Sequence, residues 1–281
     1  MGAAPPGPLG IVASGGELPL AIAEWVRDSG RGVFVVAFAG SADRWVEAWP
    51  HAWVSLGEVG KVVKALRANG CVDVVLAGKL ARPKFHEIKL DAKGVLVAPR
   101  IVAAARKGDD ALLRAVVETF EREGFRAVGA HEAAPGLVAP EGILGRIAPS
   151  ADDEADVEAA FRVARAMGAL DIGQAAVVCE GLTLAVEAAE GTDAMIVRLA
   201  SLPEHIRGTP ARRRGVLAKA PKPIQDRRTD LPVIGVQTVR NAAAAGLAGI
   251  AVEAGGALIL GRRAVIAEAD RLGLFLVGVP G

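Results

Sequence analysis

The residues best suited to carry chemistry lie close together in the stretch 216–235, VLAKAPKPIQDRRTDLPVIG. Lys219 and Lys222 stand beside prolines that stiffen the backbone, and Asp230 comes just before an apolar segment typical of a strand. Cations of this kind neutralise phosphate oxygens while a carboxylate holds Mg²⁺, which is the arrangement that phosphoryl chemistry requires. The alternative is a solvated basic loop with a capping aspartate.

Two further polar clusters precede this stretch. In LDIGQAAVVCEG, 170–181, Gln174 comes directly before a predicted buried strand. In AVEAAEGTDAM, 185–195, we expect a strand that ends at 190–193 and a helix that Thr192 and Asp193 are suited to cap. The carboxylates of Glu187, Glu190 and Asp193 are close together in this sequence.

The first half begins with a strand, a glycine turn and a helix. Leu9–Ala13 is a short apolar run, Ser14, Gly15 and Gly16 form the turn, and Leu18–Arg27 is predicted to be helical. Such a turn presents backbone N–H groups to an anion. The glycine spacing matches neither the dinucleotide fingerprint nor the Walker A loop, so a βα turn without a ligand remains an equal alternative.

Alternating elements follow this turn. Strands are predicted at 33–38 and 72–77, with a helix at 59–68 between them, which indicates a parallel sheet with ligands at the carboxyl ends of its strands. If the stretch 45–53 were helical, Trp45, Trp49 and Trp53 would share one face, as a packed aromatic cluster or as an amphipathic patch at a lipid surface, but Pro50 interrupts such a helix.

The segment 103–113, AAARKGDDALL, has two interpretations. It is either a loop in which an aspartate caps a helix over 111–122, or a site in which Lys107 binds a phosphate and an aspartate lies near a metal.

Composition and motifs exclude several classes of function. The 281 residues suggest about two domains. A net charge of +1 and an aromatic content of 4% argue against a nucleic-acid-binding protein. The four histidines and two cysteines show no zinc spacing, and the two thiols are expected to be buried in a reducing compartment. No signal peptide is recognised, and 242–260 is too rich in Ala and Gly for a membrane span, so we expect a soluble, cytoplasmic protein.

A stretch rich in proline and glycine, 133–150, separates the two halves. We therefore expect an α/β domain at 1–134, a linker at 135–150 and a second α/β domain at 151–281. The acidic run that opens the second domain is expected to complement a helix dipole.

Taken together, these motifs resemble the LpxI family of UDP-2,3-diacylglucosamine pyrophosphatases. The resemblance rests on SGGELP at residue 14, AARKGDDALL at 104–113, LDIGQ at 170–174, EGTDAM at 190–195 and LAKAPKPIQ with DLPVIG at 217–235. It implies an N-terminal Rossmann-like parallel-sheet domain and a distinct C-terminal α/β domain, with the ligand in a cleft between them. Ser14 stands where many relatives carry a third glycine.

The resemblance also implies an activity. The family hydrolyses UDP-2,3-diacylglucosamine to UMP and 2,3-diacylglucosamine 1-phosphate (lipid X) in the lipid A biosynthesis of Gram-negative bacteria, and it requires Mg²⁺. The substrate then implies peripheral contact with the inner face of the inner membrane, and base rates favour a homodimer.

The implied site has its essential residue at Asp230, as a Mg²⁺ ligand or a base that orients water. Asp193 would be a further metal ligand, with help from Glu187. The expected substrate-binding residues are Gly15, Gly16, Lys107, Gln174, Thr192, Asp193, Lys219, Lys222 and Gln225. Two alternatives remain open at this point: another nucleotide-dependent enzyme, and a carrier of nucleotide-sugar lipids that catalyses nothing.

Overall fold

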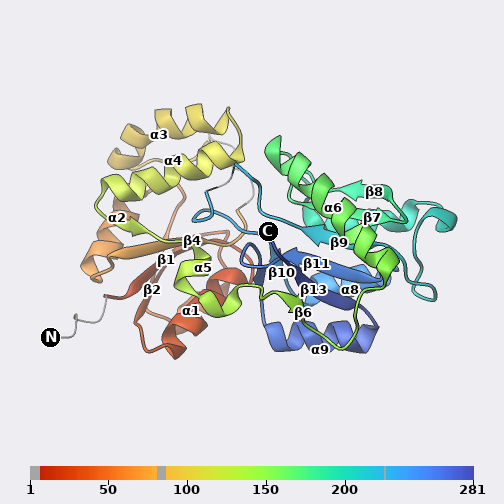
Figure 1. The fold of residues 1–281 in the computed structure, drawn as a ribbon. Helices are drawn as coiled ribbons and strands as arrows, with labels where there is room; N and C mark the ends of the chain where they lie inside the picture. The colour runs from red at the N-terminus through yellow and green to blue at the C-terminus, as the bar shows by residue number, and fades with distance from the viewer. Residues whose placement is uncertain (1–6, 81–86, 225) are drawn as a thin grey trace. The chain divides into compact units, whose positions relative to one another are not determined.

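The structure is a computed structural model that describes residues 7–80, 87–224 and 226–281 (Figure 1). The chain divides into two compact units. The first comprises Met1–Gly136 together with Asp226–Asp230, and the second comprises Leu137–Gln225 and Leu231–Gly281. A short piece of the second half of the sequence therefore belongs to the first unit.

The first unit contains a five-stranded parallel sheet with the strand order β3-β2-β1-β4-β5. Its apolar strands are buried because helices cover the sheet, as parallel sheets require. The elements are β1 (Leu9–Ala13), α1 (Leu18–Asp28), β2 (Val33–Phe38), β3 (His51–Val54), α2 (Val59–Ala68), β4 (Asp73–Ala77), α3 (Ala92–Ala105), α4 (Asp109–Arg122), β5 (Arg126–Ala127) and α5 (Ala130–Ala133).

This order confirms the expected Rossmann-like arrangement. The chain passes from β1 outward to β2 and β3, and then returns to the other side of β1 with β4. The point where the strand order reverses lies between β1 and β4, and ligands of such sheets bind outside the carboxyl ends of these strands. The predicted glycine turn after β1 lies at this point.

The second unit contains a six-stranded mixed sheet with the order β6-β13-β11-β9-β7-β8, and a two-stranded parallel sheet of β10 and β12. Strands β13, β11 and β9 are parallel to one another, whereas β6, β7 and β8 pair antiparallel. The elements are β6 (Gly142–Ile143), α6 (Ala151–Ala169), β7 (Ala175–Cys179), β8 (Leu182–Val186), α7 (Gly191–Arg198), β9 (Val216–Lys219), β10 (Val233–Ile234), α8 (Val236–Ala244), β11 (Gly249–Glu253), β12 (Leu258–Ile259), α9 (Arg262–Leu272) and β13 (Phe275–Val279).

The core of the second unit has two layers. Phe161 of α6 packs with Val178 and Phe275 on one face of the large sheet. Met195 of α7 and Val239 of α8 belong to the cluster on the other face. The acidic start of α6 is structural as expected, because the Ser150 hydroxyl accepts a hydrogen bond from the backbone N–H of Asp153 in a capping box.

Two expectations about local structure are wrong, and the helical face of tryptophans does not form. Trp53 lies on strand β3 rather than on a helix shared with Trp45 and Trp49. Helix α4 begins at Asp109 after Gly108, whose positive φ of 127° makes the turn, so no aspartate caps it. Strand β8 ends at Val186, well before the expected strand end at 190–193.

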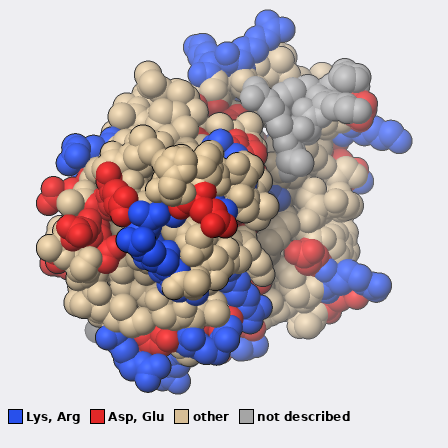
Figure 2. Space-filling view, turned by 90° about the vertical axis from the view of Figure 1, so that its right-hand side faces the viewer, with Lys and Arg blue, Asp and Glu red and all other residues tan. Residues whose placement is uncertain are grey.

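Both cysteines are buried free thiols, as expected. Among the described residues no helix has both the length and the apolar character needed to cross a membrane. Figure 2 shows basic and acidic side chains interspersed over one face of the molecule, in keeping with the small net charge.

Candidate active site

Three side chains and one backbone carbonyl group of the second unit form a polar network that is largely buried. Lys219, the last residue of β9, is only 4% exposed. Its Nζ lies 2.8 Å from Thr192 Oγ1 and 3.2 Å from the carbonyl oxygen of Val233. Thr192 Oγ1 lies 2.6 Å from Glu187 Oε1. Because an ammonium group can only donate, the threonine hydroxyl accepts from Lys219 and donates to Glu187.

The strand pairing explains why these residues meet. Strand β7 runs antiparallel to β9, and its first residue, Ala175, stands opposite Lys219. The backbone N–H of Glu187 donates to the carbonyl of Ala175, and Glu187 Oε2 accepts the backbone N–H of Gln174 at 3.1 Å. A side chain at Gly173 would come within 2.1 Å of the Glu187 carbonyl oxygen, so this close approach requires glycine.

Gln174 also carries an unsatisfied acceptor. Its Oε1 is buried and has no hydrogen-bond partner within the described part of the chain. A buried acceptor without a partner costs about 1–3 kcal/mol, which a ligand with a hydroxyl or amide donor would recover. The structure thus brings together three of the predicted residues, Gln174, Thr192 and Lys219, with Glu187 beside them.

The expectation that Thr192 or Asp193 caps α7 through its side chain is wrong. Glu190 is the N-cap residue, it makes no capping hydrogen bond with its side chain, and Gly191, with a φ of 79°, makes the turn into the helix. This turn leaves the Thr192 hydroxyl available to the buried network. Asp193 instead accepts a hydrogen bond from Asn241 Nδ2 of α8 at 3.0 Å.

Lys222 lies in the same unit, after β9. Its Nζ lies 2.7 Å from Asp171 Oδ1, in an ion pair of which both side chains are largely buried. Asp171 has a φ of 57°, an uncommon conformation for a residue with a side chain. Nothing in the local sequence singled out Asp171 as a partner of Lys222. Gln225 lies outside the described residues.

Asp230 ends the segment that belongs to the first unit. Arg228 anchors this segment, since its guanidinium lies 2.7 Å from Asp226 Oδ2 and 2.7 Å from Glu121 Oε1 of α4. The backbone N–H of Asp226 points to Asp110 Oδ1 at 3.4 Å. The hydrogen bond from Arg228 lowers the pKa of Asp226 below its ordinary value. Asp230 itself is half-buried.

The glycine turn of the first unit is held by its neighbours. The backbone N–H of Gly15 donates to the Lys79 carbonyl oxygen at 3.1 Å, and Lys79 N–H donates back to Gly15 at 2.6 Å. The N–H of Gly16, whose φ is 92°, donates to Asp43 Oδ2 at 3.1 Å. An exposed carboxylate therefore sits on the N–H group that was predicted to receive a phosphate. Asp43 was missed because no local pattern marks it.

Lys107 is exposed in the turn between α3 and α4. Its backbone N–H donates to the Ala104 carbonyl oxygen.

The carboxylates present decide how this protein could hold a magnesium ion. Among the residues that the structure describes, no three His, Cys, Asp or Glu side chains gather as a ready-made metal cage. Mg²⁺ is commonly bound by one or two carboxylates plus phosphate oxygens and water. Asp230 offers one half-buried carboxylate of the type that this mode uses.

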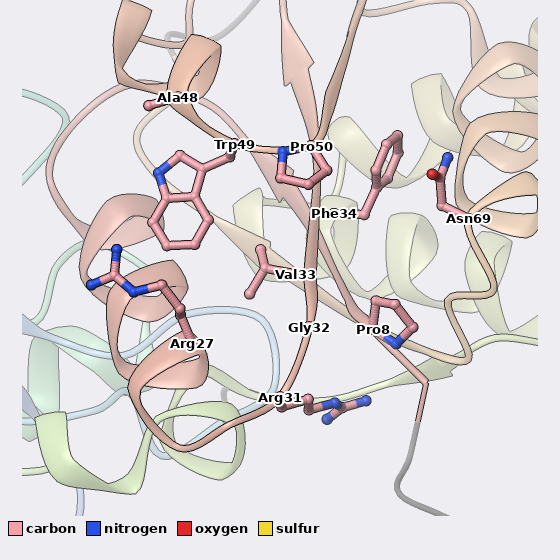
Figure 3. Close-up of a pocket in the computed structure, with 10 residues that line it drawn as sticks. All are labelled: Pro8, Arg27, Arg31, Gly32, Val33, Phe34, Ala48, Trp49, Pro50 and Asn69. Atoms are coloured by element: carbon pink, nitrogen blue, oxygen red, sulfur yellow. The ribbon is translucent and has the colours of Figure 1, made fainter.

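A hollow of about 590 Å³ opens on the first unit, and none of the predicted site residues is among those that line it (Figure 3). Pro8, Val33 and Pro50 place it at the amino ends of β1, β2 and β3. The Arg27 guanidinium stacks over Trp49 on its wall, with 5.1 Å between the charged carbon and the ring centre. This is the sheet edge opposite the one where ligands of such folds bind.

The comparisons with known proteins agree with this architecture. The LpxI N-terminal domain matches residues 8–137, and the LpxI C-terminal domain matches residues 140–277. The chain is 55% identical to the UDP-2,3-diacylglucosamine pyrophosphatase LpxI of Caulobacter vibrioides over 271 residues, which cover 96% of this chain and 97% of that protein. Both domains match in order and nearly in full, and the chain therefore belongs to the LpxI family.

Proposed function

We propose that the protein hydrolyses the pyrophosphate bond of UDP-2,3-diacylglucosamine, with release of UMP and 2,3-diacylglucosamine 1-phosphate, as a step of lipid A biosynthesis. The observation that carries this proposal is the 55% identity to a pyrophosphatase that acts on this compound, spread over nearly the whole of both chains. The buried cation beside polar side chains in the second unit supports it, because a diphosphate needs charge neutralisation.

Lys219 and Lys222 would neutralise the diphosphate oxygens. Lys219 is held by Thr192 and Lys222 by Asp171, so both ammonium groups are oriented before substrate binds. The unsatisfied Gln174 Oε1 would accept a hydrogen bond from a sugar hydroxyl. Thr192 and Gln225 would help to position the sugar and the diphosphate.

Asp230 would act either as a ligand of Mg²⁺ or as the base that orients the attacking water and accepts its proton. As water oxygen bonds to one phosphorus, the bond from that phosphorus to the bridging oxygen breaks, and the electron pair leaves with the other phosphate. The half-buried carboxylate stands at the end of a segment that Arg228 holds, and this fixed position suits a group that must aim a water molecule.

Asp230 and Asp193 are the carboxylates that would hold Mg²⁺, which would supply charge neutralisation at the phosphates. Gly16 and Lys107 of the first unit would contact phosphate oxygens, Gly16 after its N–H exchanges Asp43 for the substrate. Gly15 would contribute to the shape of the turn, since its own N–H is bonded to Lys79.

The substrate carries two acyl chains, so the protein would work at the surface of the membrane that contains it, in the cytoplasm. Release of UMP from UDP-2,3-diacylglucosamine by the purified protein tests the proposal, with and without Mg²⁺. We expect Mg²⁺-dependent release of equal amounts of UMP and lipid X. Tight binding of the lipid without any turnover would favour a carrier instead, and the absence of both would overturn the proposal.

A further inference from the structure

Helix α3 exposes an apolar face to solvent. Its exposed positions follow one another at intervals of three or four residues, apart from one adjacent pair, and such spacing places them on one face of the helix. None of these residues is polar or charged. Val95 is 57% exposed and Leu96 is 81% exposed, and Leu90 is exposed just before the helix. The exposed positions of the helix are Ala92, Val95, Leu96, Pro99 and Ala103.

The charged residues of α3 face inward. Lys93 Nζ lies 2.6 Å from Glu123 Oε1, and Arg100 Nη2 lies 2.6 Å from Thr119 Oγ1 of α4. At the helix start, Asp91 accepts the backbone N–H of Gly94 and that of Gly60 in α2, each at 2.7 Å. These contacts fix the rotation of the helix, so its apolar side is held outward. This is the reverse of an ordinary surface helix.

Helix α3 lies in an outer layer of the first unit. Figure 1 shows it beyond α4, farther from the sheet, and its packing partners are the helices α2 and α4. Only Gly94 and Ala105 of the helix are buried. Its apolar face is therefore not needed for the core of this unit.

Cations flank this face at both ends. Lys89 precedes the helix, Arg106 and Lys107 follow it, and all three are exposed. Glu87 and Asp109 are exposed carboxylates at the same ends, so the exposed cations are in excess by one. The nearby carboxylate of Glu123 is already paired with Lys93 and Arg67, and that of Asp110 is paired with Arg114. An apolar stripe with an excess of exposed cations at its ends is the pattern of a helix that lies in the interface of an anionic bilayer.

We propose that the outer face of α3 docks the protein on an anionic lipid surface, with Val95 and Leu96 inserted among the acyl chains and with Lys89 and Arg106 at the headgroups. The choice of a bilayer rests on the proposed function, whose substrate is a lipid. A second copy of the chain fits less well. Two copies packed through this face around a twofold axis would bring together two surfaces that each have an excess of cations, which disfavours the contact.

The test measures binding to vesicles without substrate. The probes are vesicles of phosphatidylethanolamine with phosphatidylglycerol, and vesicles of phosphatidylcholine alone. We expect the wild type to sediment with the anionic vesicles, and the double variant Val95→Gln/Leu96→Gln to lose about tenfold or more in partitioning. Glutamine is a good helix former, so the helix is retained. The matched control is Val197→Gln, which changes a residue of α7 that is also exposed.

A second variant tests the charges. Lys89→Glu/Arg106→Glu should weaken binding to anionic vesicles about tenfold and should remove most of its dependence on salt. Equal sedimentation of wild type and both variants would overturn the proposal. So would a fall in oligomeric mass for Val95→Gln/Leu96→Gln with unchanged vesicle binding, which would identify the face as a contact between copies.

Failure of this inference differs from failure of the proposed function. Hydrolysis of substrate dispersed in detergent does not need α3, so the double variant should match the wild type there and should be slower only on substrate embedded in vesicles. Wild-type protein that fails on dispersed substrate but still sediments with vesicles would contradict the proposed function alone.

Discussion

At the scale of single residues, the Thr192 hydroxyl is the point where a buried ammonium and a buried carboxylate meet. Lys219 donates to it and it donates to Glu187, so the three groups are ordered in one direction. Removal of the hydroxyl would leave both of its neighbours with an unmet hydrogen bond in a place shielded from water. The cost of such a loss exceeds the net contribution of a typical hydrogen bond.

Thr192→Val should therefore lower the free energy of unfolding by about 1–3 kcal/mol, because its similar shape removes the hydroxyl alone. Thr192→Ser should stay close to the wild type. Denaturant unfolding measures the first effect, and kcat/KM on the lipid substrate should fall for valine but not for serine. Wild-type stability and turnover in Thr192→Val would show that the network is unimportant.

The other decisive residue is Asp230. Asp230→Asn keeps the shape of the side chain but cannot accept a proton, so kcat should fall by about a hundredfold or more while the protein still binds substrate. Asp152→Asn, in the exposed first turn of α6, is the matched control and should leave kcat unchanged. Near wild-type turnover of Asp230→Asn would remove this residue from the mechanism.

At the scale of elements, the amino edge of the first sheet is held by one buried carboxylate. Asp73 begins β4 and lies 2.7 Å from the Arg126 side chain of β5 and 2.7 Å from Arg31, which precedes β2. The hydrogen bond from Arg126, reinforced by Arg31, lowers the pKa of Asp73 below its ordinary value of 3.8. A lowered pKa means that the ionised form stabilises the fold.

This carboxylate makes stability depend on pH in acid. Its contribution is fully present above pH 3.8, the ordinary pKa, and is lost as the pH falls through the lower pKa of the folded state. Asp73→Asn should lower the free energy of unfolding by about 2 kcal/mol at neutral pH. As the pH falls into the acid range, this variant should lose less further stability than the wild type. Unfolding curves between neutral pH and acid measure this, with the exposed Asp28→Asn as control. Parallel curves for wild type and Asp73→Asn would contradict the assignment.

Elements with a continuous apolar run could be predicted from the sequence. Strands 9–13 and 33–38 and the helix 59–68 are confirmed with these bounds, because buried parallel strands and amphipathic helices have strong patterns. Strand β3 was missed because this edge strand contains His51 and an exposed Trp53 in place of an apolar run. Helix α3 was missed as well, and Pro99 and Gly94 in its sequence argue locally against a helix.

The candidate site, too, could be predicted from the sequence only in part. Gln174, Thr192 and Lys219 were predicted from their residue types at the ends of strands, and strand pairing brings them together. The partners of the 226–230 segment could not be predicted, since Arg228 and Glu121 are far apart in sequence and only the tertiary fold joins them.

At the scale of the whole molecule, the chain returns from its second half to complete its first unit. Asp226–Asp230 belongs to that unit, held by Arg228 between Asp226 and Glu121. All four tryptophans lie in the same unit, between Trp25 and Trp53. Their fluorescence therefore reports the unfolding of the first unit alone.

Arg228→Ala should lower the free energy of unfolding that tryptophan fluorescence reports by about 1 kcal/mol, although this residue lies far from every tryptophan in sequence. Arg212→Ala changes an exposed arginine in the second unit and should leave the tryptophan signal unchanged. An unchanged transition in Arg228→Ala would mean that the returning segment does not stabilise the first unit.

The central claim, that this chain hydrolyses a lipid-linked diphosphate, is tested most directly by its reaction in water enriched with heavy oxygen. We predict that UMP and 2,3-diacylglucosamine 1-phosphate form in equal amounts, and that one of them carries a single heavy oxygen on its phosphate. The labelled product identifies the phosphorus that water attacks. Products without label would contradict hydrolysis and indicate group transfer, and no release of UMP at all would contradict the account as a whole.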